Sequence, residues 1–262
     1  MIYILPRTRG LNGPRMLREA GATILNRDSR PRRDRMVTAW GSHEVPSWAS
    51  RVNWLNHPTV TPLVSNKMNW AQVVQSANIS PYNLDFTMNI DQAREWASEQ
   101  GTKVVCRTLT KSSKGKGIVI ARNADQVVKA PLYSRYFRKT SEYRIMYAPY
   151  AGAAFCYSKR RPNGVEMDRD SLLIRSRDSG YISQAEEFIR LPYAIEWAVD
   201  NTAIYLQDHY GLRYAAYDVA YNKHTDTACI IEANTAPALN DVTAAQTLIM
   251  LEQLENYHVK EA

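Results

Sequence analysis

Two stretches near the carboxyl end of the chain decide the fold: YDVA at 217–220 and IIEANTAP at 230–237. Both are apolar runs typical of β-strands, and the polar residues between them predict a hairpin. If the hairpin turns about Thr225, strand residues whose numbers add to 450 face each other. This register predicts that Asp218 lies directly opposite Glu232.

The facing carboxylates predict a metal site. Asn234 lies two residues after Glu232 and therefore projects from the same face of its strand. Two carboxylates across a strand pair repel each other unless a positive charge lies between them. With an amide oxygen they form the all-oxygen ligand set that Mg²⁺ prefers. The alternative is a hairpin with incidental acids, one of them turned to solvent. Because both flanks are strongly apolar and restrict the acids, the pattern favours the metal site.

Two weaker motifs precede this hairpin. The loop TKSSKGKG at 110–117 combines small residues, which let backbone amides approach an anion, with three lysines. It does not match the Walker phosphate-binding pattern, and a flexible hairpin tip has the same composition. Further on, Glu142 and Arg144 share one face of a predicted strand and could bracket a polar ligand. A surface ion pair is the alternative for these two residues.

Composition and charge restrict the class of protein. The 262 residues are 45% hydrophobic and 23% charged, which indicates a soluble globular chain. No apolar run approaches the roughly 18 residues that span a bilayer, so we expect no membrane segment. The net charge is +7, and residues 1–64 hold ten arginines, no lysine and four acids, hence +6 of it. Cys106, Cys156 and Cys229 lie in apolar runs and are expected to be buried, reduced thiols of a cytosolic protein.

Hydrophobic periodicity predicts an α/β protein. The first strands alternate with a helix, which indicates a small, mostly parallel βαβ unit over residues 1–64. We expect a proline-rich connector at 56–62 and a polar, irregular loop at 159–184. The expected strands are 3–5, 22–25, 36–40, 102–109, 118–122, 132–137, 142–148, 152–158, 214–221 and 228–233. The expected helices are 15–20, 66–77, 90–100, 193–209 and 243–257.

The three motifs, in this order and spacing, resemble the ATP-grasp superfamily of carboxylate–amine ligases. The chain looks closest to the branch that contains the ribosomal-protein glutamate ligases and glutathione synthetases, and to stand-alone proteins of this size encoded by bacteriophages. The resemblance covers about residues 62–245 and is strongest in Asp218 with 232–237, which looks like the family's D…E-x-N-x-x-P ending.

The resemblance implies a fold and a division of the chain. The fold class is α/β (α+β), with a small N-terminal βαβ domain followed by two α+β subdomains that sandwich ATP. In this sequence the N-terminal preliminary domain would be 1–64, the central subdomain with a flap loop 65–132, and the C-terminal subdomain with the magnesium site 133–262.

The resemblance also assigns nucleotide-binding residues. The flap over the triphosphate would be residues 112–117, and the hinge at 135–137 would recognise adenine through its backbone. Two departures stand out, since Arg107 replaces the usual lysine and the usual hinge acid is missing. Glu142 would hold the ribose hydroxyls. The nucleotide-binding residues implied are Lys67, Arg107, Ser112, Ser113, Lys114, Gly115, Lys116, Arg135, Tyr136, Phe137 and Glu142.

The remaining assignments concern the transferred phosphoryl group. Arg144 and one of Lys159, Arg160 or Arg161 would face the γ-phosphate, with Arg160 and Arg161 preferred as catalytic residues. Arg175 is a weaker candidate. Asp218, Glu232 and Asn234 would carry Mg²⁺. The cofactors implied are ATP and two Mg²⁺ ions, with Mn²⁺ as a substitute.

The implied activity is an ATP-dependent ligase that joins a carboxylate to an amine through an acyl-phosphate and releases ADP and phosphate. The carboxylate would come from an acidic substrate. The amine acceptor would be a small molecule, a peptide or a nucleic-acid-linked group. A kinase acting on a small alcohol or a nucleic-acid-linked acceptor is the second hypothesis, and a binding protein on a decayed scaffold is the third. We expect a protein of the cytoplasm, or of the host cytoplasm if a phage encodes it, without a membrane partner. Whether the chain forms a homodimer is left open.

Overall fold

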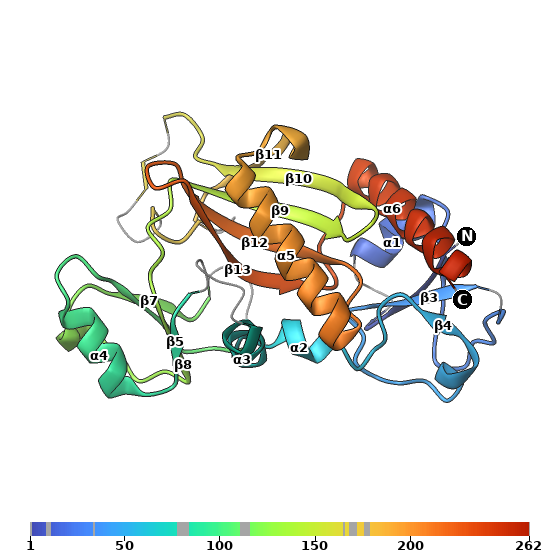
Figure 1. Ribbon diagram of the computed structural model, residues 1–262, viewed down its shortest axis with the longest axis horizontal. Coiled ribbons are helices and arrows are strands. Elements are labelled where there is room, and N and C mark those ends of the chain that lie inside the picture. Colours follow the sequence, from blue (N-terminus) through green and yellow to red (C-terminus); the bar gives the residue numbers. More distant parts are fainter. Residues whose placement is uncertain are drawn as a thin grey trace.

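The computed structural model describes residues 2–8, 12–33, 35–77, 84–110, 116–164, 166–167, 172–175 and 179–261. Within these ranges three β-sheets follow one another along the chain (Figure 1). No helix in these ranges is long and apolar enough to cross a bilayer. Cys106, Cys156 and Cys229 are buried and free, as predicted, and burial raises the pKa of the last two to about 12.

The first sheet is the predicted parallel βαβ unit. Its strands pair in the order β2-β1-β3-β4, and every pairing is parallel. Helix α1 (Asn12–Glu19) connects the first two strands and buries Met16 and Leu17. The strands are β1 (Tyr3–Pro6), β2 (Thr23–Ile24), β3 (Met36–Trp40) and β4 (Asn53–Trp54), and a 3-10 turn, η1, spans Ala49–Arg51.

The second sheet is antiparallel, in the order β5-β8-β6-β7. Helix α4 (Ile90–Ser98) begins at Asn89, whose side chain accepts hydrogen bonds from the amides of Asp91 and Gln92. Helices α2 (Thr61–Ser65) and α3 (Lys67–Ala77) precede this sheet. Its strands are β5 (Phe86–Thr87), β6 (Val104–Arg107), β7 (Ile118–Ala121) and β8 (Leu132–Arg135), and η2 spans Ala124–Gln126.

The third sheet carries the predicted hairpin at its edge and has the order β11-β10-β9-β12-β13. Helix α5 (Tyr193–Tyr210) covers one face of it and ends at Gly211, whose φ of 70° is the left-handed conformation that glycine favours. Helix α6 (Asp241–Glu261) packs against β10 and α1 (Figure 1). The strands are β9 (Ser141–Ala148), β10 (Gly152–Arg160), β11 (Ile182–Glu186), β12 (Ala215–Asn222) and β13 (Thr227–Asn234), and η3 spans Phe188–Arg190.

Some elements differ from the sequence prediction. The expected connector at 56–62 includes the start of α2. The expected irregular loop at 159–184 is shorter, because residues 159–160 belong to β10 and residues 182–184 to β11. The strands β4, β5 and β11 and the helix α2 were not predicted. Two-residue strands present no alternating pattern, so hydrophobic periodicity cannot detect them.

Close contacts hold the first sheet against the end of the hairpin. The Asn12 side-chain amide donates a hydrogen bond of 2.7 Å to the Leu239 carbonyl oxygen. A Cβ at Gly13 would lie 2.6 Å from Nε1 of Trp40 and 3.1 Å from the carbonyl oxygen of Pro237, so only glycine fits there. The first sheet is therefore locked to the segment that directly follows Glu232 and Asn234.

Candidate active site

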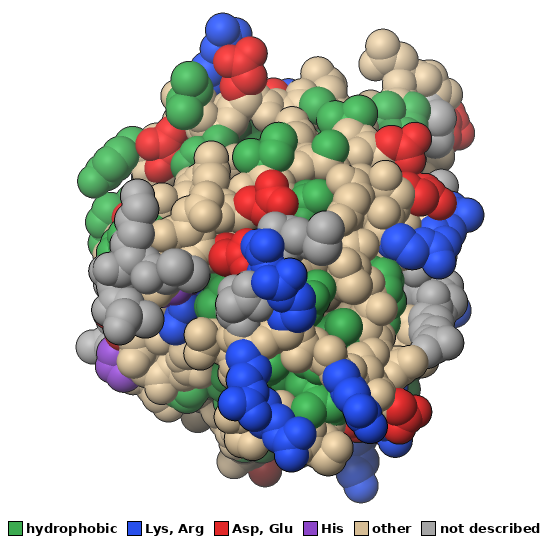
Figure 2. All heavy atoms as spheres, turned by 90° about the vertical axis from the view of Figure 1, so that its right-hand side faces the viewer, with side chains coloured by type: hydrophobic (Ala, Val, Ile, Leu, Met, Phe, Trp, Pro, Cys, Tyr) green, Lys and Arg blue, Asp and Glu red, His purple; other side chains and the backbone are tan. Residues whose placement is uncertain are grey.

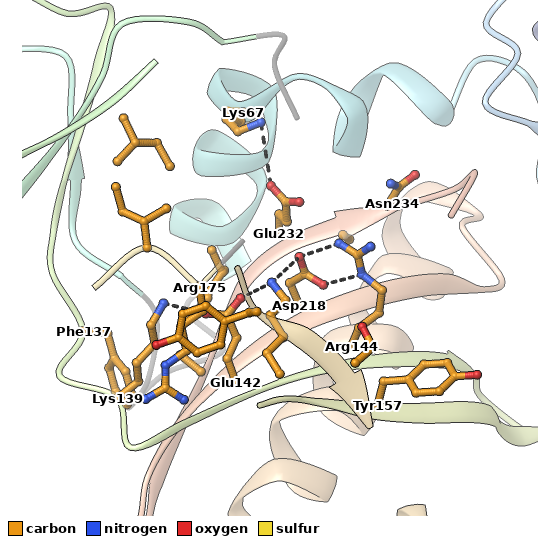
Figure 3. Close-up of a pocket in the computed structure, with 18 of the residues that line it drawn as sticks. Lys67, Phe137, Lys139, Glu142, Arg144, Tyr157, Arg175, Asp218, Glu232 and Asn234 are labelled. Carbon is orange, nitrogen blue, oxygen red and sulfur yellow. Dashed lines mark hydrogen bonds and ion pairs between the residues drawn. The ribbon is translucent and has the colours of Figure 1, made fainter. Parts of the chain in front are cut away.

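A cavity of about 1170 Å³ lies between the second and third sheets and reaches α1 and the start of α6. Among the described residues its lining includes eight basic and three acidic side chains. Such an excess of positive charge suits a polyanion such as a nucleoside triphosphate. Figure 3 shows how the charged side chains of β9, β12 and β13 point into this space.

The predicted register of the hairpin is confirmed at the two facing carboxylates. Asp218 pairs with Glu232 across β12 and β13, and both line the cavity together with Asn234. The register then shifts by one residue, so that Val219 pairs with Ile230. The Asn234 Oδ1 accepts a hydrogen bond of 2.8 Å from the Ala236 amide, which fixes the orientation of the side chain at the cavity wall.

Arg144 is the strongest partner of Asp218. Its Nε and Nη2 atoms donate to the two carboxylate oxygens at 2.7 Å each, a bidentate pair. Lys159 Nζ lies 3.7 Å from the same carboxylate. Burial alone would raise the pKa of Asp218, but Arg144 and Lys159 outweigh burial and lower it, so Asp218 is ionised.

Glu232 has the opposite electrostatic environment. Burial and the negative charge of Asp218 raise the pKa of Glu232, and Lys67 Nζ, at 3.7 Å, opposes this only partly. Glu232 therefore resists ionisation beside the ionised Asp218. An additional positive charge between the two carboxylates would stabilise the ionised form of both. The two acids and the amide oxygen of Asn234 fit a hard divalent cation. In the described ranges no three His, Cys, Asp or Glu side chains gather, so the nucleotide and water would have to complete its coordination.

Glu142 is buried between two lysines. Its Oε2 accepts from Lys139 Nζ at 2.5 Å, and its Oε1 accepts from Lys159 Nζ. Burial would raise the pKa of Glu142, but these two ammonium groups outweigh burial and lower it. Both carboxylate oxygens are thus engaged, and the predicted contact with the ribose hydroxyls would require one lysine to move.

A β-bulge decides which basic residue of β10 enters the cavity. The β9–β10 register shifts between Ala153 and Phe155, after which Tyr157 pairs with Arg144. A one-residue shift exchanges the two faces of a strand, so Lys159 joins Arg144 and Glu142 on the cavity side. Figure 3 shows Lys139, Glu142, Arg144 and Asp218 linked by hydrogen bonds and ion pairs along this face.

The two preferred catalytic arginines lie elsewhere. Arg160 donates to Ser158 Oγ at 2.9 Å and to Glu186 at 3.0 Å, and its side chain is 53% exposed. Arg161 is also exposed, and neither lines the cavity. Of the three basic residues that the sequence left open, the structure brings Lys159 to Asp218. Arg175 lines the cavity and donates to the Thr140 carbonyl oxygen at 2.9 Å.

The predicted phosphate-binding residues line the same cavity. Arg107 is buried, with 6% of its surface exposed, and burial lowers its pKa while Glu232 opposes the shift. Lys67 and Lys116 also contribute to the lining. The predicted flap residues Ser112, Ser113, Lys114 and Gly115 lie outside the described residues.

The predicted hinge at 135–137 lines the cavity, but several of its hydrogen-bond donors already have partners within the protein. The Arg135 guanidinium binds Glu99 and Asp85 and stacks over Trp96 at 5.1 Å. It is therefore engaged with these residues and not with Asp218 or Glu232. The Arg135 and Tyr136 amides already donate to the carbonyl oxygens of Asp85 and Lys103. Next to Phe137, apolar side chains that sequence reasoning missed surround this region: Leu84, Val105, Ile118, Ile120, Leu173, Ile174 and Ile231.

The opposite end of the cavity has a different chemistry. Here α1, β10 and the start of α6 contribute amide, hydroxyl and aromatic side chains. The described lining residues at this end are uncharged at neutral pH, whereas Lys159, further along β10, belongs to the basic end. The uncharged residues are Asn12, Phe155, Tyr157, Ala238, Leu239, Asn240 and Thr243. Sequence reasoning missed this neutral end, because no motif marks residues that come together from three separate elements.

The comparisons with known proteins identify the fold. No protein-family model matches the sequence, and neither does any curated protein. The D-alanine–D-alanine ligase from Bacillus anthracis superposes with a TM-score of 0.61 at 10% identity, covering 100% of both chains. The ATP-grasp ligase PsnB, complexed with a minimal precursor, gives 0.60 at 11% identity, covering 97% of this chain and 98% of that one.

A third solved structure is a RimK domain protein ATP-grasp from Sphaerobacter thermophilus. It gives a TM-score of 0.57 at 12% identity and covers 98% of this chain and 99% of that chain. Identities this low establish the fold alone. The chain has the ATP-grasp fold, which confirms the expectation drawn from the D…E-x-N-x-x-P resemblance.

Proposed function

From the ATP-grasp fold and the charges in the cavity, we propose that the protein is an ATP-dependent carboxylate–amine ligase that works through an acyl-phosphate. The observation that carries this proposal is the Asp218–Glu232 pair, set across β12 and β13 in a cavity rich in arginine and lysine. Carboxylates and cations in this arrangement suit phosphoryl transfer, in which catalysis is largely positioning and charge stabilisation.

ATP would bind with its base between the apolar side chains near the hinge and its phosphates toward Lys67, Arg107 and Lys116. Asp218, Glu232 and Asn234 would hold Mg²⁺, which would offset the charge of the β- and γ-phosphates. Arg144 and Lys159 lie next to Asp218 and would stabilise the phosphoryl group as it is transferred.

The chemistry requires no nucleophilic side chain. A carboxylate of the substrate attacks the γ-phosphorus, ADP leaves, and the resulting acyl-phosphate is a reactive electrophile. An amine then attacks the acyl carbon, phosphate leaves, and an amide bond remains. The neutral end of the cavity would hold these two groups, because the nucleotide occupies the basic end. Exclusion of water protects the acyl-phosphate from hydrolysis.

Trapping with hydroxylamine tests the reaction class. We expect ATP, Mg²⁺ and a mixture of candidate carboxylic acids to yield ADP, and added hydroxylamine to yield the hydroxamate of the substrate acid. A kinase would instead give a stable phosphorylated product without hydroxamate. That result, or an absence of ADP formation with all acids and with cell extract as the substrate source, would contradict the ligase proposal.

The three consecutive basic residues at the end of β10 and directly after it can be compared directly. Lys159→Met should lower kcat for ADP formation by about 100-fold, since one preorganised charge at the transferred phosphoryl group is removed. Arg160→Gln and Arg161→Gln should each change kcat less than about twofold, because exposed charges of this kind contribute little. Steady-state kinetics on the three variants check this prediction. A large loss in Arg160→Gln with near-normal Lys159→Met would restore the preference drawn from the sequence.

A further inference from the structure

A basic surface on the first sheet is unused by the proposed reaction. We define the arginine surface as Arg7, Arg27, Arg30, Arg32 and Arg33, all of which are exposed. Arg7 follows β1, and the other four lie in the connection from β2 to β3. Figure 2 shows Lys and Arg side chains gathered on the lower part of the face that carries this end of the molecule. The excess is intrinsic to the sequence, since residues 1–64 carry ten arginines, no lysine and four acids.

A small crevice lies where this surface meets the sheet. It has a volume of about 130 Å³ and is lined by Arg7, Thr8, Asn26, Arg27 and Ser42, with Glu44 in contact with Arg27. β2 lies on one side of β1 and β3 on the other, and all are parallel, so the crevice is at the carboxyl ends of strands where the strand order reverses. Crevices at this position are the usual place where open parallel sheets bind phosphate-bearing ligands.

The crevice and the neutral end of the main cavity lie at the same end of β1. Thr8 lines the crevice, and Asn12, a short stretch of chain later, lines the cavity. The hydrogen bond from Asn12 to Leu239 ties the start of α1 to the segment after β13. A partner whose negative charges rest on the arginine surface could therefore extend an uncharged reacting group into the neutral end.

We propose that the arginine surface binds the phosphate backbone of a nucleic acid, which carries the group that reacts in the cavity. Guanidinium groups bind phosphate oxygens in a bidentate manner, which ammonium groups cannot do, and this surface is built from arginine without lysine. The carboxyl-end crevice favours phosphate over the carboxylates of an acidic peptide. The position of the reacting group rests on the proposed ligase function, whereas the binding of nucleic acid stands without it.

Fluorescence anisotropy with labelled single-stranded RNA, duplex RNA and single-stranded DNA tests the proposal. The test variant is Arg27→Gln/Arg30→Gln/Arg32→Gln/Arg33→Gln. The matched control, Arg94→Gln/Lys129→Gln/Arg190→Gln/Lys223→Gln, removes four exposed charges elsewhere. We expect the wild type to bind at least one of these nucleic acids and the test variant to lose about 100-fold or more in affinity. The control should stay within about threefold of the wild type.

The salt dependence of binding gives a second measure. The slope of log K, where K is the association constant, against log salt concentration should become shallower by about 3 in the test variant, since each phosphate contact on a single strand contributes roughly 0.7.

Three results would overturn the proposal. They are absence of binding by the wild type, equal losses in both fourfold variants, and a preference for poly-glutamate over every nucleic acid, which would identify an acidic peptide as the partner. ADP formation in the hydroxylamine assay should be unchanged in the test variant, because none of its four positions lines the main cavity. Failure of nucleic-acid binding is thus separated from failure of the ligase proposal.

Discussion

Glu232→Gln is expected to lower ADP formation by on the order of a thousandfold while leaving the protein folded. The substitution keeps the shape of the side chain and removes one of the two facing carboxylates. Because burial and Asp218 already raise the pKa of Glu232, removal of its charge should not lower the free energy of unfolding, and relief of the repulsion should raise it slightly. Loss of activity combined with retained stability would identify Glu232 as a ligand of the reacting complex.

The measurement is ADP release at saturating ATP and Mg²⁺, together with thermal unfolding in the presence and absence of MgATP. We expect MgATP to raise the Tm of the wild type and to have little effect on the Tm of Glu232→Gln. Glu95→Gln, at an exposed position of α4, is a matched control and should behave as the wild type does. Near-normal turnover in Glu232→Gln would show that the metal assignment is wrong.

The centre of the site was predictable because it depends on local pattern. The apolar strands on either side of Asp218 and Glu232 define a hairpin, and a hairpin's register follows from where it turns. One register shift lies directly beyond Asp218, on the side of the turn, and leaves the Asp218–Glu232 pair intact. The family resemblance added the ATP-grasp fold, which periodicity alone cannot specify.

The rest of the site depends on features that leave no mark in the sequence. The bulge near Ala153 inserts one residue into β10 and thereby turns Lys159, rather than Arg160, toward Asp218. The amino-acid composition of β10 does not predict that insertion. The neutral end of the cavity assembles from residues as distant as Asn12 and Asn240, which only tertiary packing brings together.

Arg144 is expected to act on the transition state rather than on nucleotide binding, and Arg144→Lys is the variant that tests this. Lysine keeps the charge but cannot reproduce the two 2.7 Å bonds to Asp218. We expect kcat to fall by about 100-fold and the KM for ATP to change less than about threefold. The guanidinium lies with Lys159 beside Asp218, whereas in the proposed complex Lys67, Arg107 and Lys116 would bind the remaining phosphates.

Arg144→Ala is the less informative change, for a structural reason. It would leave Asp218 buried without its strongest partner, and breaking a buried ion pair costs about 3–5 kcal/mol. Thermal unfolding should therefore report a lower Tm for Arg144→Ala than for Arg144→Lys. Arg94→Lys, on the exposed face of α4, controls for the change of residue type. Equal losses of kcat and of ATP affinity in Arg144→Lys would show instead that Arg144 binds the nucleotide equally in the ground state and the transition state.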